Sequence, residues 1–236
     1  MIRMFQTQFD SYVCDGESIT AERDGFRYVA TVHHDSDMGP PWEEHDGHGP
    51  VSDWTGRDKR PGELVLCTDR GSRRYYDFAE ACRIARRDIW GIPPKGLKVE
   101  RAPDGKWNWI SVDGYATGFP CWNSATRAAY EYVRSTMSPR EYAARAARHD
   151  FEMLRDWCDD EWTWCGIAVQ LFGPDGEELT GDYDFATWGI ECNYPDSRNE
   201  YLSEVAEDLA QEIHRLHVLP MLQGAATVAA MEGVGP

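Results

Sequence analysis

Residues 162–176 read Trp-Thr-Trp-Cys-Gly-Ile-Ala-Val-Gln-Leu-Phe-Gly-Pro-Asp-Gly. Apolar side chains alternate along this stretch as far as Phe172, and the Gly-Pro-Asp-Gly sequence at 173–176 is typical of a tight turn. The pattern predicts a β-strand followed by a turn. Residues 177–180 and a further strand near residues 187–192 are expected to follow, which makes this region an antiparallel meander.

Two other segments show the same combination of strand, tight turn and strand. Residues 19–34 turn at Asp24-Gly25, and residues 97–112 turn at Asp104-Gly105. Helical patterns are expected at residues 77–88, 123–136, 138–158 and 200–216, and a short strand at 64–67. The 200–216 helix is expected to begin with a cap at Asp196 or Ser197. We therefore predict an α+β fold, mainly antiparallel sheets of hairpins with helices packed on one face, arranged as one sheet or as two subdomains.

Charge is distributed unevenly along the 236 residues, whose formal net charge is −17. Residues 57–106 have a net charge of +5, whereas residues 150–216 have −15. We expect three regions. The first, at 1–136, consists of hairpins and helices and includes a His/Asp-rich loop at 35–62 and the basic segment 57–106. An acidic helix-meander-helix region at 137–219 and a flexible tail at 220–236 follow. The chain therefore consists of a mildly basic central segment between two acidic terminal segments.

Composition excludes several protein classes. No stretch approaches the roughly 18 consecutive apolar residues that span a bilayer, and the first ten residues contain no apolar signal core. The seven cysteines include no Cys-x-x-Cys pair, which indicates reduced thiols rather than a disulfide framework or a zinc ribbon. We expect a cytoplasmic protein that does not associate with membranes.

The densest group of polar residues is at 33–48, with four of the seven histidines and five acids. Imidazole and carboxylate are good ligands for a divalent metal such as zinc. The candidate ligands are His34, His45 and His48, completed by Asp35 or Glu44. Such a site predicts a metal-dependent hydrolase or nuclease; the alternative is that these are solvated or hydrogen-bonded loop residues.

Acidic residues recur through the C-terminal half of the chain. Carboxylates on a rigid helix and sheet can imitate a phosphate array and bind a basic surface of another protein. The candidate partner-binding face comprises Asp159, Asp160, Glu161, Glu177, Glu178, Asp182, Asp184, Glu204 and Asp208. The alternative is an ordinary solubilising surface.

A basic patch in the middle of the chain is the one place where direct phosphate contacts are plausible. Its candidate residues are Arg73, Arg74, Arg86 and Arg87. This patch predicts a modest nucleic-acid-binding protein, unless the arginines pair with the acidic C-terminal segment or form a solvated helix face. Direct binding of nucleic acid is disfavoured by the net charge.

Motifs of nucleophilic or nucleotide-driven catalysis are missing from the sequence. There is no Gly-x-Ser-x-Gly elbow, no Gly-x-x-x-x-Gly-Lys loop and no Gly-x-Gly-x-x-Gly loop. The sequence therefore favours a binding protein over an enzyme, with the metal-dependent hydrolase as the enzymatic alternative.

Residues 41–54 read Pro-Trp-Glu-Glu-His-Asp-Gly-His-Gly-Pro-Val-Ser-Asp-Trp. Together with residues 60–63, 76–85 and 186–191, this motif resembles a family of tailed-phage and prophage proteins that has no assigned activity. The resemblance implies a phage origin and a place in the host cytoplasm. By analogy with small acidic phage proteins, it favours an inhibitor of a basic host protein in defence or nucleic-acid processing.

Overall fold

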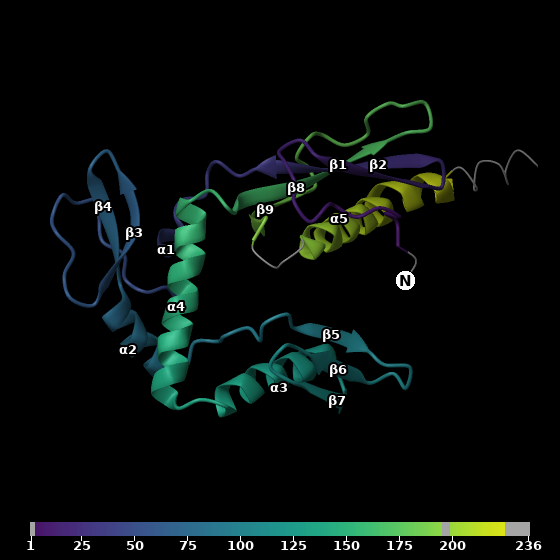
Figure 1. Cartoon of the computed structure of the whole chain (residues 1–236). Helices are drawn as coiled ribbons and strands as arrows, with labels where there is room; N and C mark the ends of the chain where they lie inside the picture. The colour runs from purple at the N-terminus through teal and green to yellow at the C-terminus, as the bar shows by residue number, and fades with distance from the viewer. Residues whose placement is uncertain (1–2, 195–198, 225–236) are drawn as a thin grey trace, which may run out of the picture. The chain divides into compact units, whose positions relative to one another are not determined.

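The structure is a computed structural model that describes residues 3–194 and 199–224. The chain divides into two compact units (Figure 1). The terminal unit combines residues 1–38 with residues 161–236, and the inserted unit is the continuous stretch 39–160. Both units contain antiparallel strands and helices, which confirms the predicted α+β class.

The expected boundary after residue 136 is not where the units divide. Helix α4 (Pro139–Cys158) was predicted to open the acidic C-terminal region, but it belongs to the inserted unit. It packs on helix α2 (Phe78–Asp88) and on strand β3 (Glu63–Asp69). The buried residues of this packing are Leu66, Tyr76, Ala81, Ala147, Phe151 and Leu154. Because this apolar face is buried against residues earlier in the chain, tertiary packing sets the boundary.

The terminal unit is built on a four-stranded antiparallel sheet of order β1-β2-β8-β9. The strands are β1 (Ser18–Arg23), β2 (Phe26–His34), β8 (Thr163–Phe172) and β9 (Ala186–Cys192). The first hairpin and the meander were each predicted from sequence. The structure joins them by pairing β2 with β8, from Arg27 opposite Phe172 to His34 opposite Cys165.

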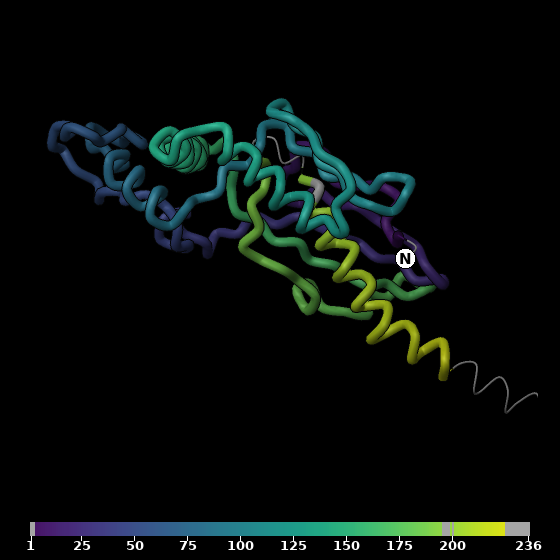
Figure 2. Tube along the Cα trace, turned by 90° about the horizontal axis from the view of Figure 1, so that it is seen from below, coloured from purple at the N-terminus to yellow at the C-terminus, as the bar shows by residue number. Residues whose placement is uncertain are grey.

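Helix α5 (Glu200–Ile213) covers one face of this sheet (Figures 1 and 2). It continues into the π-helical turn η1 (His214–Val218) and then as helix through residue 224. The interface is formed by alternate residues of β2 and β8 and by one apolar stripe of α5. Its fully or nearly fully buried side chains include Tyr28, Val32, Ile167, Val169, Leu171, Leu202, Ala206, Ala210 and Ile213. Their removal from water is the main stabilising contribution in this unit.

Helix α5 begins at Glu200 as predicted, whereas its C-terminal end differs from the sequence-based expectation. Asn199, in the left-handed region at φ 53°, precedes the first residue of the helix. The caps expected at Asp196 or Ser197 lie outside the described residues. The tail expected from residue 220 is helical as far as residue 224, and residues 225–236 also lie outside the described part.

The inserted unit contains two hairpin-based substructures. One combines α1 (Pro41–Glu44), the β3–β4 hairpin with β4 at Ser72–Asp77, α2 and α4. The other combines the three-stranded sheet β5 (Lys98–Arg101), β6 (Trp107–Ile110) and β7 (Tyr115–Phe119) with helix α3 (Trp122–Ser135). Sequence reasoning missed β4 and β7, because the arginines of β4 and the glycine of β7 interrupt the apolar alternation.

The starts of α2 and α4 follow the predicted capping chemistry, whereas the cap of α3, expected at Asn123 or Ser124, is Cys121. The Asp77 side chain accepts a hydrogen bond from the Glu80 backbone N–H at 2.9 Å. Ser138 and Glu141 form the reciprocal capping box at the start of α4. These caps satisfy backbone donors that have no partner within the helix, so local sequence was sufficient to locate both helix starts.

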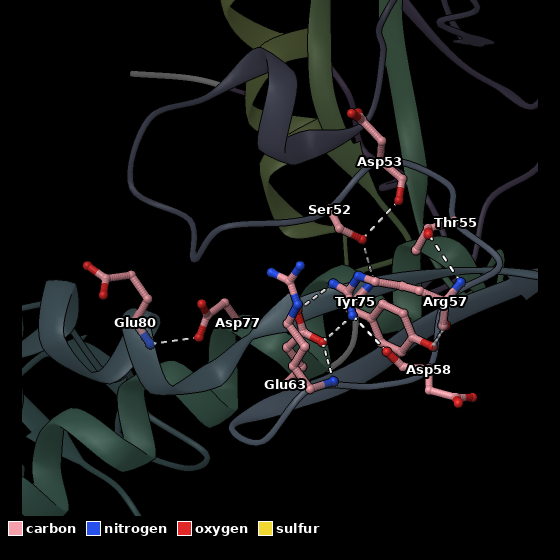
Figure 3. A network of polar contacts seen from close by, with 10 residues as sticks. Ser52, Asp53, Thr55, Arg57, Asp58, Glu63, Tyr75, Asp77 and Glu80 are labelled. Atoms are coloured by element: carbon pink, nitrogen blue, oxygen red, sulfur yellow. Dashed lines mark hydrogen bonds and ion pairs between the residues drawn. The ribbon is translucent and has the colours of Figure 1, made fainter.

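The segment at 51–63, which was expected to lack regular structure, is tied to β4 by a polar network (Figure 3). The Tyr75 backbone N–H donates to Ser52 Oγ at 3.0 Å, and the Tyr75 hydroxyl donates to the Arg57 carbonyl at 2.7 Å. The Arg57 guanidinium donates to both Glu63 carboxylate oxygens, at 2.7 and 2.6 Å. The segment is therefore an ordered edge of the hairpin.

Glu63 should make the stability of the protein dependent on acidity. Hydrogen bonds from Arg57, assisted by the Arg60 backbone N–H, lower the pKa of Glu63 from 4.5 to about 2. A carboxyl whose pKa is depressed by folding contributes stability above its unfolded pKa, and this contribution is lost as the pH falls from about 4.5 through about 2. In urea unfolding at a series of pH values, Glu63→Gln should lower stability at neutral pH and flatten the decline across that window.

The matched control is Glu131→Gln, which makes the same charge change at an exposed position of α3. It should leave the decline below pH about 4.5 as steep as in the wild-type protein. Parallel pH profiles for Glu63→Gln and wild type would contradict the assigned role of Glu63.

Candidate interaction surface

The two units differ sharply in charge. The terminal unit contains 5 Lys and Arg residues against 21 Asp and Glu, a net charge of −16. The inserted unit contains 19 basic and 20 acidic residues, a net charge of −1. The acidity that the sequence assigned to both ends of the chain is therefore concentrated in one folded unit.

All nine residues of the predicted acidic face are exposed, but they do not belong to one unit. Asp159 and Asp160 follow the end of α4 in the inserted unit, whereas Glu161 begins the second segment of the terminal unit. Glu177, Glu178, Asp182 and Asp184 lie in the loop between β8 and β9, and Glu204 and Asp208 lie on α5. The terminal unit thus holds seven of the nine candidates.

Side-chain and backbone hydrogen bonds hold the loop between β8 and β9 to the sheet. Gln170 of β8 donates through Nε2 to Glu178 Oε1 and to Asp182 Oδ1, both at 2.9 Å. Asp184 accepts from the Gly181 backbone N–H at 2.8 Å. These contacts hold the acidic loop in one conformation, so its carboxylates are presented from a fixed position.

The face of the sheet opposite α5 carries an aromatic cluster that the sequence analysis missed. Trp188 lies 6.2 Å from His33 and 5.7 Å from Tyr183, measured between ring centroids, and His33 lies 5.4 Å from Tyr183. His33 is directly opposite Gly166 in the β2–β8 ladder. Gly166 is a sequence signal for this cluster, because an isolated glycine within a strand pattern marks a bulge or a close approach of another group to the backbone.

The predicted metal ligands are divided between the two units. His34 and Asp35 belong to the terminal unit, whereas Glu44, His45 and His48 belong to the inserted unit. Within residues 3–194 and 199–224, no group of three or more His, Cys, Asp or Glu side chains could hold a metal ion.

Each predicted ligand in the terminal unit has a local structural contact. The Asp35 carboxylate is buried and accepts from the Gly189 backbone N–H at 3.0 Å. His34 is exposed, and its Nδ1 lies 3.3 Å from Thr163 Oγ1. These contacts pair strand ends within the sheet.

In the inserted unit, His48 belongs to a buried polar network. Its Nδ1 lies 2.6 Å from Asp150 Oδ1 on α4. The other oxygen of Asp150 accepts from the Tyr76 hydroxyl at 2.6 Å and from the Gly49 backbone N–H at 2.8 Å. Burial and the adjacent Asp150 charge raise the pKa of Tyr76, so the phenol stays protonated and donates to the carboxylate. The network fastens the loop to α4.

The two remaining candidate ligands lie beside helix α1. Glu44 Oε1 accepts from the Gly39 backbone N–H at 2.8 Å. His45 is exposed, and its backbone N–H donates to the Pro41 carbonyl at 3.0 Å, which ends the short helix.

Two of the four residues of the predicted basic patch contact side chains of the inserted unit, whereas Arg73 and Arg86 are exposed. The Arg74 guanidinium lies 5.1 Å from the ring centroid of Trp42 and 5.0 Å from that of Trp54. Arg87 makes an ion pair with Asp88 at 2.7 Å. Arg73 lies on β4 and Arg86 on α2, so the four candidates come from two elements. This engagement favours the intramolecular alternative over phosphate binding.

The chain was compared with protein-family models, with curated proteins and with solved structures, and no match was found. Among the described residues, no helix combines the length and apolarity needed to cross a bilayer.

His48→Ala should destabilise the protein by about 1.5–3 kcal/mol, because it removes a hydrogen bond to a buried carboxylate. Since the role of His48 is to hold Asp150, a chelator should change neither this loss nor the stability of the wild-type protein. Thermal unfolding with and without chelator, combined with elemental analysis, tests this. Stoichiometric metal that disappears in His48→Ala would contradict the structural role.

Gly166→Ala should disturb the aromatic cluster. A Cβ at residue 166 would overlap the Trp188 ring, so Trp188 must move. We expect a changed near-ultraviolet circular dichroism spectrum and a loss of about 1–3 kcal/mol of stability. Gly56→Ala is the control, because an added Cβ there meets nothing within 4 Å. An unchanged spectrum in Gly166→Ala would show that the ring is not seated on Gly166.

Proposed function

We propose that this chain is a phage-encoded binding protein that inhibits a host defence or nucleic-acid-processing protein by covering its basic surface. The supporting observation is the net charge of −16 on the terminal unit against −1 on the inserted unit. A unit with this charge attracts cationic protein surfaces, accelerates encounter with them and repels nucleic acid.

The exposed acids of α5 support imitation of a phosphate backbone. Glu204, Asp208 and Glu212 are exposed and recur every four residues, a rise of about 6 Å per step along a helix. Every second phosphate of one DNA strand advances by about 7 Å along the duplex axis. A row of arginines or lysines that grips a DNA strand could therefore contact this row of carboxylates.

The arrangement of the inserted unit agrees with this division of roles. Its arginines make contacts with aromatic rings and acids of the same unit, as Arg57 does with Glu63 and Tyr75. Its net charge is close to zero, so its long-range attraction for a charged partner is weak. The terminal unit is therefore the proposed binding surface.

The proposed phage origin rests on the resemblance carried by residues 41–54. These residues lie in the inserted unit, so the motif and the proposed binding surface belong to different parts of the chain. A phage protein of this kind would act in the host cytoplasm.

The test is competition with DNA for a purified host protein. The chain is immobilised to capture nucleic-acid-binding proteins from a bacterial lysate, and a captured protein is purified and loaded with labelled duplex DNA. Titration of the wild-type chain should displace the DNA, with weaker competition at higher salt. Because reversal of two exposed charges removes roughly 1–2 kcal/mol of attraction, Glu204→Lys with Asp208→Lys should need about ten-fold more protein.

The matched control is the double variant Glu131→Lys with Glu152→Lys. It makes the same change in net charge at exposed positions of the inserted unit, on α3 and α4. It should compete nearly as well as wild type. Equal loss in both double variants would show that only total charge matters, and no loss in either would contradict binding through the acidic terminal unit.

A further inference from the structure

Trp188 and Tyr183 are two neighbouring, exposed aromatic side chains of the acidic unit. The exposed fraction is 44% for Trp188 and 57% for Tyr183. Their rings lie 5.7 Å apart at an interplanar angle of 52°, and His33 contacts both. Exposed aromatic residues that form a group on a folded surface commonly mark a site of interaction.

The position of Trp188 is specified by its surroundings. Its ring lies over Gly166, where any side chain would occupy the same space. The following residue, Gly189, has φ +71°, a conformation that favours glycine, and its N–H is held by the buried Asp35 carboxylate. The β8–β9 register shifts at this point, between Cys165 and Ile167. Such bulges re-aim a side chain, and here the bulge presents an indole to solvent.

Carboxylates accompany the aromatic rings. Asp182 and Asp184 flank Tyr183, and all three residues are exposed. Gln170 holds Asp182 and Glu178 on the face of β8 that carries Gly166. The positions of Gly166 and Gln170 are separated by about 13 Å along the strand, a span that one short peptide can cover.

We propose that Trp188, Tyr183 and His33 form a binding site for an arginine side chain in a basic segment of the partner, with the guanidinium stacked on Trp188. The ring face attracts a cation, and tryptophan does so best. Arginine fits better than lysine, because its planar, weakly hydrated guanidinium both stacks on rings and donates paired hydrogen bonds to carboxylates. This inference rests on the proposed function and names the chemistry that its partner presents.

The same chemistry occurs within the inserted unit, where the chain supplies its own cation. Arg57 lies 4.6 Å from the ring centroid of Tyr75 while it donates to both oxygens of Glu63. In the part of the chain that the structure describes, no arginine or lysine stacks on Trp188 or Tyr183. The aromatic and acidic components are thus present in the terminal unit, and in this proposal the partner supplies the cation.

The test uses two labelled peptides of equal length and charge, one of alternating Arg and Gly and one of alternating Lys and Gly. Fluorescence anisotropy with the full chain should show tighter binding of the arginine peptide, by about five-fold. Trp188→Leu should weaken arginine-peptide binding about five-fold and remove the preference over lysine. Trp54→Leu, at a tryptophan of similar exposure (43%) in the inserted unit, is the control and should change neither.

Tyr183 provides a second variant that does not disturb the strand, because it lies in the loop. Tyr183→Phe keeps the ring and should retain the arginine preference, whereas Tyr183→Leu should reduce it. Circular dichroism confirms that each variant is folded. If Trp188→Leu and Tyr183→Leu both bind the arginine peptide as wild type does, the arginine site is overturned.

The two proposals fail in different ways. If Glu204→Lys with Asp208→Lys loses competition against DNA while the tryptophan variant keeps its arginine preference, the aromatic site is wrong and the acidic binding function stands. If the tryptophan variant loses the preference while the charge variants compete as wild type does, the arginine site stands and the charge-based function is wrong.

Discussion

The pairing of β2 with β8 is the constraint on which the rest of the structure depends. It joins residues 26–34 to residues 163–172 through a continuous antiparallel ladder. One face of the ladder holds Tyr28, Val32, Ile167 and Leu171 against α5. Because the side chains of a strand alternate, a shift of one residue would turn these apolar groups away from the helix, so burial fixes the register. The same register fixes His33 opposite Gly166 on the other face.

This pairing also determines how charge is distributed. The two acidic ends of the chain fold together, while the intervening residues 39–160 form their own unit with balanced charge. Attraction between acidic residues cannot explain this arrangement, since like charges repel. Apolar burial under α5 outweighs the repulsion, and the acids remain on the exposed surfaces where water and salt screen them. A strongly acidic surface on a rigid sheet and helix is the result.

The polar loop residues illustrate why residue type alone did not identify a site. His48 and Asp35 have the chemistry of metal ligands, but each has a hydrogen-bond partner in its own unit, Asp150 for His48 and the Gly189 backbone N–H for Asp35. A buried carboxylate needs hydrogen-bond donors, and backbone N–H groups, a phenol and an imidazole supply them here. These residues therefore stabilise loops. The exposed aromatic cluster around Trp188 was not predicted, because Trp188 also fits the residue pattern of a β-strand.

The sequence by itself determined the local elements. Asp24-Gly25 set the first hairpin, the Ser138-Pro139 and Asp77 signals set two helix starts, and the alternation through 163–172 set the central strand, because turns, caps and periodicity depend on neighbouring residues. Only the tertiary structure decided that β2 pairs with β8, that α4 belongs to the inserted unit, and that Trp188 lies over Gly166. These contacts join residues that are distant in the chain, and they are selected by the burial and shape of surfaces that exist only after the elements have packed.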